Sequence, residues 1–132
     1  LFLMNKILVE VSVGELLDKI SILEIKKERI SNQESAKFIE KEYLILKDQL
    51  DKNIKYDEKL DKLFNKLKDI NIALWEKEDE KRSYEKNSDF GDKFIKVSRD
   101  IHFFNDDRSN IKLDINKITG SLIREIKQYT SY

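Results

Sequence analysis

The chain has 132 residues, enough for one domain with a single hydrophobic core. Hydrophobic and charged residues each make up 39%, and with no proline and three glycines this composition favours long solvated helices over compact sheets. The 26 basic residues balance the 26 acidic ones and there is no cysteine, which argues against a nucleic-acid partner and excludes disulfides, zinc–thiolate sites and thiol catalysis.

The N-terminal segment reads as a short extended arm or strand. Within "KILVEV" every second residue, Ile7, Val9 and Val11, is β-branched and apolar, which is the spacing of one face of a strand. A lone strand needs a partner, which a second subunit could supply. Polar residues interrupt the apolar run, so it offers neither a membrane span nor a signal peptide, and we expect a cytoplasmic protein that makes no membrane contact. Met4 is a candidate initiator, and residues 1–6 are expected to be poorly ordered.

The first helix is expected from Ser12 to about Ile30. Ser12 and Glu15 have the spacing of a capping box, in which each side chain bonds the other residue's backbone N–H. Ile22 and Ile25 are displaced from the main apolar face, so the helix is apolar on more than one side. A second apolar stripe implies a second contact, and we expect a homodimer through this helix or the N-terminal segment.

Two further helices follow. "SNQE", residues 31–34, repeats the capping-box pattern and predicts a second helix capped by Ser31. A break near residues 52–58 precedes a third helix, for which Asp57 is a suitable cap. Its apolar positions are spaced by three and four as far as Leu74, after which the sequence becomes strongly charged.

The fourth helix carries the longest regular pattern. With Asp89 as its cap, apolar residues alternate in steps of four and three over positions 90, 94, 97, 101, 104, 108, 111, 115, 118 and 122, interrupted only by Arg108. This heptad pattern predicts a long helix packed as in an antiparallel coiled coil and ended by Gly120. The alternative is a break at Asn105 and Asp106.

Arg108 therefore occupies a core position. An unpaired guanidinium there would cost several kcal/mol, so it must reach solvent or meet carboxylates. The expected partners are Glu24 and Glu78, in a buried network that fixes helix register. A functional alternative is an anion site in which Arg108 and Lys112 bind the ligand and Asn105 or Asp106 orients it.

Other residues suggest alternative chemistry. Two ExxD pairs, Glu15/Asp18 and Glu76/Asp79, could share Mg²⁺ as in helical nucleotide pyrophosphohydrolases. Trp75, Asp79 and Arg82 fall on one helix face, either as a rim tryptophan beside a surface ion pair or as a ligand-stacking group.

The segments "VSVGELLDKISILEIKKERI", "NIALWEKEDEKR" and "FIKVSRDIHFFNDDRSNIKLDIN" resemble a family of small uncharacterised bacterial proteins classified as a domain of unknown function. The resemblance covers the chain from about residue 7 and rests on the GEL-DK-ILE and ND-R-IK-IN patterns. It implies a shared helical domain and no particular activity. Lys77 and Lys81 depart from the apolar residues expected there. The polar positions that it marks for testing are Asp18, Lys19, Glu24, Glu78, Asp79, Arg82, Asn105, Asp106, Arg108 and Lys112.

The sequence thus predicts one all-α domain over residues 1–132, an antiparallel bundle of about four helices with long third and fourth helices. The expected function is a non-enzymatic cytoplasmic interaction or scaffold module, without a cofactor, that binds an anionic small molecule near Arg108. The alternative is a Mg²⁺-dependent nucleotide pyrophosphohydrolase that uses Glu15, Asp18, Glu76 and Asp79.

Overall fold

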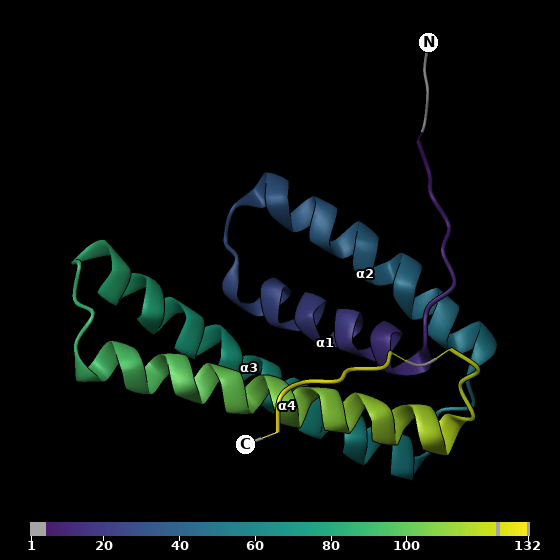
Figure 1. Cartoon of the computed structure of the whole chain (residues 1–132). Helices are drawn as coiled ribbons and strands as arrows, with labels where there is room; N and C mark the ends of the chain where they lie inside the picture. The colour runs from purple at the N-terminus through teal and green to yellow at the C-terminus, as the bar shows by residue number, and fades with distance from the viewer. Residues whose placement is uncertain (1–4, 124, 132) are drawn as a thin grey trace.

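The computed structural model describes residues 5–123 and 125–131 and is all-α over them (Figure 1). Its helices are α1 (Val13–Arg29), α2 (Gln33–Asn53), α3 (Glu58–Lys86) and α4 (Asp92–Thr119). These bounds confirm the predicted all-α fold with four helices and a short extended segment before the first. The predicted disorder of residues 1–6 concerns mainly residues 1–4, which lie outside the described part.

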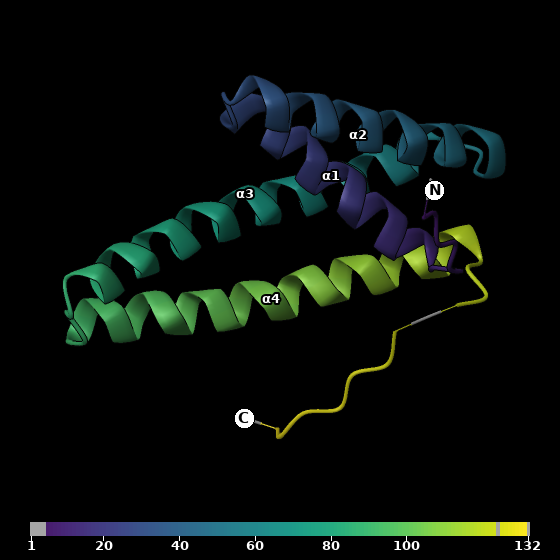
Figure 2. The same cartoon turned by 90° about the horizontal axis from the view of Figure 1, so that it is seen from above.

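Helix α1 lies at the centre of the arrangement. Its backbone approaches those of the other three helices, whereas the backbone of α2 approaches only that of α1. Helices α3 and α4 form a long antiparallel hairpin, and α1 lies between this hairpin and α2 (Figure 2). The second apolar stripe of α1 is therefore covered within the chain, where Ile25 is buried and Ile22 partly buried. That stripe no longer argues for a partner subunit.

Two groups of buried apolar residues hold the helices together. The larger one joins all four helices and contains Leu17, Ile20, Leu50, Leu60, Phe64, Leu67 and Ile115. The smaller one, Leu74, Val97 and Ile101, lies in the α3–α4 hairpin. The predicted heptad positions of α4 are buried at Val97, Ile101 and Ile115 and partly buried between the last two. Ile118 is exposed within the helix, and Phe90 and Leu122 fall outside it and are exposed.

Three of the predicted helix ends are confirmed. The Ser12 Oγ accepts a hydrogen bond from the Glu15 backbone N–H at 3.0 Å, which caps α1. The Asp57 carboxylate caps α3 by accepting from the Leu60 N–H at 2.8 Å. Gly120 ends α4 with a left-handed backbone, φ 65°, which favours glycine.

Two predicted caps were wrong. Asn32, not Ser31, caps α2, because its Oδ1 accepts from the Ser35 N–H. Helix α4 begins after Gly91, and Asp89 accepts from the Gly91 N–H in the preceding turn instead of capping the helix. The helix is continuous through residues 105 and 106, so the alternative break is not present.

A close contact at Gly14 sets the register between α1 and α4. The buried Gly14 N–H donates to the Asn116 Oδ1 at 2.7 Å. A Cβ added at Gly14 would lie 2.6 Å from the Lys112 carbonyl oxygen, so only glycine lets the two helix backbones approach this closely. The helices run antiparallel here, so one turn further along each places Asp18 beside Arg108.

We predict that Gly14→Ala lowers the free energy of unfolding by about 1–3 kcal/mol, because the new methyl group overlaps backbone that cannot move freely. Alanine in place of a helical glycine ordinarily stabilises a protein by up to about 1 kcal/mol. A loss of stability would therefore show that the methyl group overlaps its surroundings. Urea unfolding followed by circular dichroism measures the change. Ser83→Ala, at an exposed position inside α3, is the control, since it introduces alanine into a helix without pressing on a neighbouring backbone. A Gly14→Ala variant as stable as the parent would show that the contact is loose.

Candidate functional site

The core position of Arg108 is explained by Asp18 of α1. Asp18 is 1% exposed, and its two carboxylate oxygens accept from the Arg108 guanidinium, with Nε to Oδ1 at 3.0 Å and the second bond from a terminal nitrogen to Oδ2. This two-point geometry is the strong form of a carboxylate–guanidinium contact. Arg108 thus meets an acid, as its position in the heptad pattern required.

Asp18 has further partners from two other helices. The Asn71 Nδ2 of α3 donates to the Asp18 Oδ1 at 2.9 Å and to the Ser21 Oγ at 2.8 Å. The Lys112 Nζ of α4 lies 3.5 Å from the Asp18 Oδ2 and donates to Glu15 at 2.7 Å. A single buried carboxylate therefore joins α1, α3 and α4.

The network keeps Asp18 ionised. Burial by itself would raise the pKa of Asp18, but the hydrogen bonds from Arg108 and Asn71 and the charges of Arg108 and Lys112 outweigh it, so this pKa lies below its usual value. Reciprocally, the hydrogen bond to Asp18 raises the pKa of Arg108. A carboxylate held in this way is a fixed structural charge.

The partners expected for Arg108 were wrong. Glu24 instead accepts from the Lys68 Nζ at 3.1 Å, and Lys68 also bonds Glu28. Glu78 is exposed and forms no ion pair with another described residue. The reason is the register set at Gly14, which brings Asp18 to Arg108 and leaves Glu24, nearly two turns further along α1, facing α3.

The predicted polar strip of α4 faces two different cavities. Arg108 and Asn105 line a space of about 350 Å³ between α1, α3 and α4, which we call the tryptophan cavity. Lys112, Asn116 and Asp106 line another of about 320 Å³, the C-terminal cavity. Arg108 and Lys112 therefore do not line one cavity. The tryptophan cavity is lined by Ile22, Ile25, Asn71, Leu74, Trp75, Glu78, Asp79, Arg82, Asn105 and Arg108.

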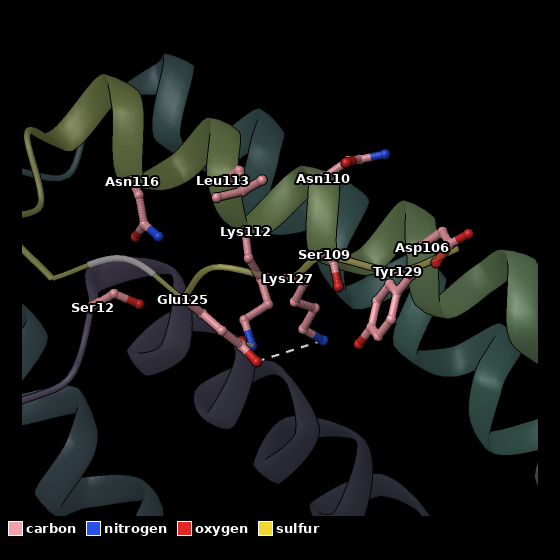
Figure 3. A pocket seen from close by; sticks show the side chains of 10 residues that line it. All are labelled: Ser12, Asp106, Ser109, Asn110, Lys112, Leu113, Asn116, Glu125, Lys127 and Tyr129. Atoms are coloured by element: carbon pink, nitrogen blue, oxygen red, sulfur yellow. Dashed lines mark ion pairs between the residues drawn. The ribbon is translucent and has the colours of Figure 1, made fainter. Parts of the chain in front are cut away.

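The C-terminal cavity lies between α4 and the chain that follows it (Figure 3). Glu125 and Lys127 reach from this segment toward Lys112, and an ion pair of 3.6 Å joins them. Lys112 is also 3.8 Å from Glu125 and pairs with Glu15 on its other side. These charges are paired within the protein, so they have little remaining capacity for a charged ligand.

Most charged side chains of the tryptophan cavity, unlike those of the C-terminal cavity, form no ion pair within the described chain. Among the residues that the structure describes, no ion pair or hydrogen bond joins the side chains of Glu78, Asp79 or Arg82 to another residue. The surface ion pair expected between Asp79 and Arg82 is therefore not formed, and both side chains line the cavity beside Trp75. Arg108 donates two of its five N–H groups to Asp18, so the other three remain for further hydrogen bonds.

Sequence reasoning missed Asn71. The buried face of α3 contains Leu60, Phe64, Leu67 and Leu74, spaced by four and three, and Asn71 occupies the remaining position of the same series. The signal that identified Arg108, a polar residue at an apolar position, was therefore present in α3 also. Leu63 and Ile70 also fit a spacing of three and four with Leu60, Leu67 and Leu74, but both are only partly buried.

The acidic pairs proposed for Mg²⁺ do not converge. Glu15 pairs with Lys112 and, at 3.8 Å, with Lys19, while Glu76 accepts from Arg29 at 3.1 Å. Within residues 5–123 and 125–131, no group of three or more metal-ligating side chains lies close enough to hold an ion. The structure therefore gives no support to the alternative of a magnesium-dependent hydrolase.

The fold and the site together define a small all-α domain built around a buried acid–arginine pair. The chain belongs to a family of unknown function, DUF6165, whose model matches residues 7–132. No curated protein and no solved structure matches it. Over its described residues, none of the helices combines the length and apolar character needed to cross a membrane.

We predict that Asp18→Asn has opposite effects in two backgrounds. In the parent chain it weakens the pair with Arg108 and lowers the free energy of unfolding. Arg108→Met strands a buried carboxylate and costs about 2–4 kcal/mol, and adding Asp18→Asn to it removes the stranded charge and recovers part of that loss. Urea unfolding of the four proteins measures both effects, with the exposed Arg99→Met as control. Equal losses from Asp18→Asn in both backgrounds would show that the two side chains are not coupled.

Proposed function

We propose that this chain is a non-enzymatic binding module that takes a small anionic molecule in the tryptophan cavity. The observation that carries the proposal is the convergence of Arg82 and Arg108 on one cavity beside Trp75. Its volume, about 350 Å³, falls within the usual range of small-molecule sites.

The two arginines have complementary properties for such a site. Arg108 is held in place by Asp18, so its remaining N–H groups are oriented before a ligand arrives and little side-chain entropy is lost on binding. Arg82 is exposed, and no other described side chain pairs with it. A carboxylate or phosphate between them would receive hydrogen bonds from a fixed donor and a mobile one.

A binding role suits the cavity better than catalysis. Its described lining contains no serine, histidine, tyrosine or lysine that could act as a nucleophile or proton carrier. Its two free carboxylates, Glu78 and Asp79, are exposed, whereas catalytic acids and bases are commonly desolvated. Asp18 is already occupied by Arg108 and Asn71.

We predict that Arg82→Gln weakens the binding of simple anions by about tenfold, the effect of losing one charge-assisted contact. The probes are inorganic phosphate and 4-methylpentanoate, an apolar carboxylate, measured by calorimetry and by shifts in melting temperature. Arg99→Gln is the matched control, because Arg99 is exposed on α4 and does not line the cavity. If both variants bind like the parent, the anion lies elsewhere and the proposal fails.

We propose a cytoplasmic homodimer as the working form. The absence of cysteine suits a reducing compartment. Support for the dimer comes from the N-terminal segment, which runs away from the helices (Figure 1) with Ile7, Leu8 and Val9 exposed at 86%, 82% and 74%. Such an apolar extended segment can pair with that of a second copy as two strands.

We predict that a double substitution, Ile7→Lys and Val9→Lys, shifts the chain toward monomer by removing apolar contact and adding repulsion between copies. Sedimentation equilibrium measures the change over a range of concentrations. Leu122→Lys, at a fully exposed leucine after α4, is the control and should leave the assembly unchanged. A parent chain that is monomeric at every concentration would overturn the dimer.

A further inference from the structure

We infer that the ligand of the tryptophan cavity is a small zwitterion, namely a free amino acid with an apolar side chain. The inference rests on the proposed function and adds the ligand's chemical class. It follows from the charge of the cavity, one acceptor oxygen without a partner among the described residues, and an apolar wall.

The charges of the cavity leave an excess of acid. Asp18 neutralises Arg108, so one positive charge, that of Arg82, and two negative charges, those of Glu78 and Asp79, remain in the cavity. A phosphate monoester, with nearly two negative charges, would add to the net negative charge of the cavity. A ligand with one carboxylate and one ammonium group satisfies the arginines and also gives the acids a cation.

An unbonded acceptor lies in the same cavity. Asn71 is 5% exposed, and its Nδ2 donates to Asp18 and Ser21, which fixes the orientation of the amide. Its Oδ1 bonds to no other described residue, and Asn71 lines the cavity. An amide oxygen that lines the cavity and has no partner among the described residues can accept from a ligand that brings an N–H donor, and an ammonium group brings three.

The rest of the lining is suited to an aliphatic or aromatic side chain. Ile22, Ile25 and Leu74 give an apolar wall, and the indole face of Trp75 offers either apolar contact or attraction to a cation. A bound amino acid would direct its carboxylate to Arg82 and Arg108, its ammonium group to Asn71 and the acids, and its side chain to the wall.

The experiment measures the binding of three molecules to the full chain: leucine and two analogues, each of which lacks one of its charged groups. L-Leucine carries both groups, 4-methylpentanoate lacks only the ammonium group, and 3-methylbutylamine lacks only the carboxylate. Calorimetry and ligand-observed saturation-transfer NMR measure binding. We expect leucine to bind about tenfold more tightly than either analogue, because each analogue loses a charge-assisted contact.

Variants locate the two groups. Glu78→Gln combined with Asp79→Asn should remove the advantage of leucine over 4-methylpentanoate, whereas Asp69→Asn, at an exposed acid of α3 outside the cavity, should preserve it. Leucine that binds no more tightly than 4-methylpentanoate, while both depend on Arg82, would overturn the zwitterion and leave the anion site standing. Loss of any dependence on Arg82 would instead overturn the proposed function.

Discussion

A carboxylate removed from water must accept hydrogen bonds from the protein, and Asp18 accepts them from side chains of two helices besides its own. Arg108 reaches it from α4 and Asn71 from α3. Replacing one partner strands the other, so the pair constrains the register of three helices even though a buried ion pair adds little net stability by itself. Helix α1 therefore holds the fold together in two ways. Its apolar faces pack against the other helices, and it places Asp18 against side chains of both α3 and α4.

The same interaction prepares the tryptophan cavity. Holding Asp18 orients both the guanidinium of Arg108 and the amide of Asn71, and each side chain has polar groups left for the cavity. The structural role of these residues and the binding role proposed for them are therefore compatible. A network that fixes register on one side can present preorganised donors and acceptors on its other side.

Much of the fold could be predicted from local signals. Ser12, Asp57 and Gly120 mark helix ends through chemistry confined to a few neighbouring residues, and heptad spacing identified α4. The spacing also predicted that Arg108 must either reach solvent or meet an acid. Which acid it meets depends on the antiparallel register of α1 and α4, fixed by the contact of Gly14 with Lys112 and Asn116 across about 100 residues of chain. Without that contact the sequence analysis chose Glu24 and Glu78 and did not identify Asp18 as the partner.

The network depends on an ionised Asp18, whose side-chain carboxyl can be titrated directly by carbon-detected NMR of labelled protein. We expect a pKa below the value of about 3.9 that is usual for aspartate, because the hydrogen bonds and charges around this carboxylate outweigh its burial. A pKa at or above that value would mean that burial dominates and that Arg108 does not hold Asp18 as described.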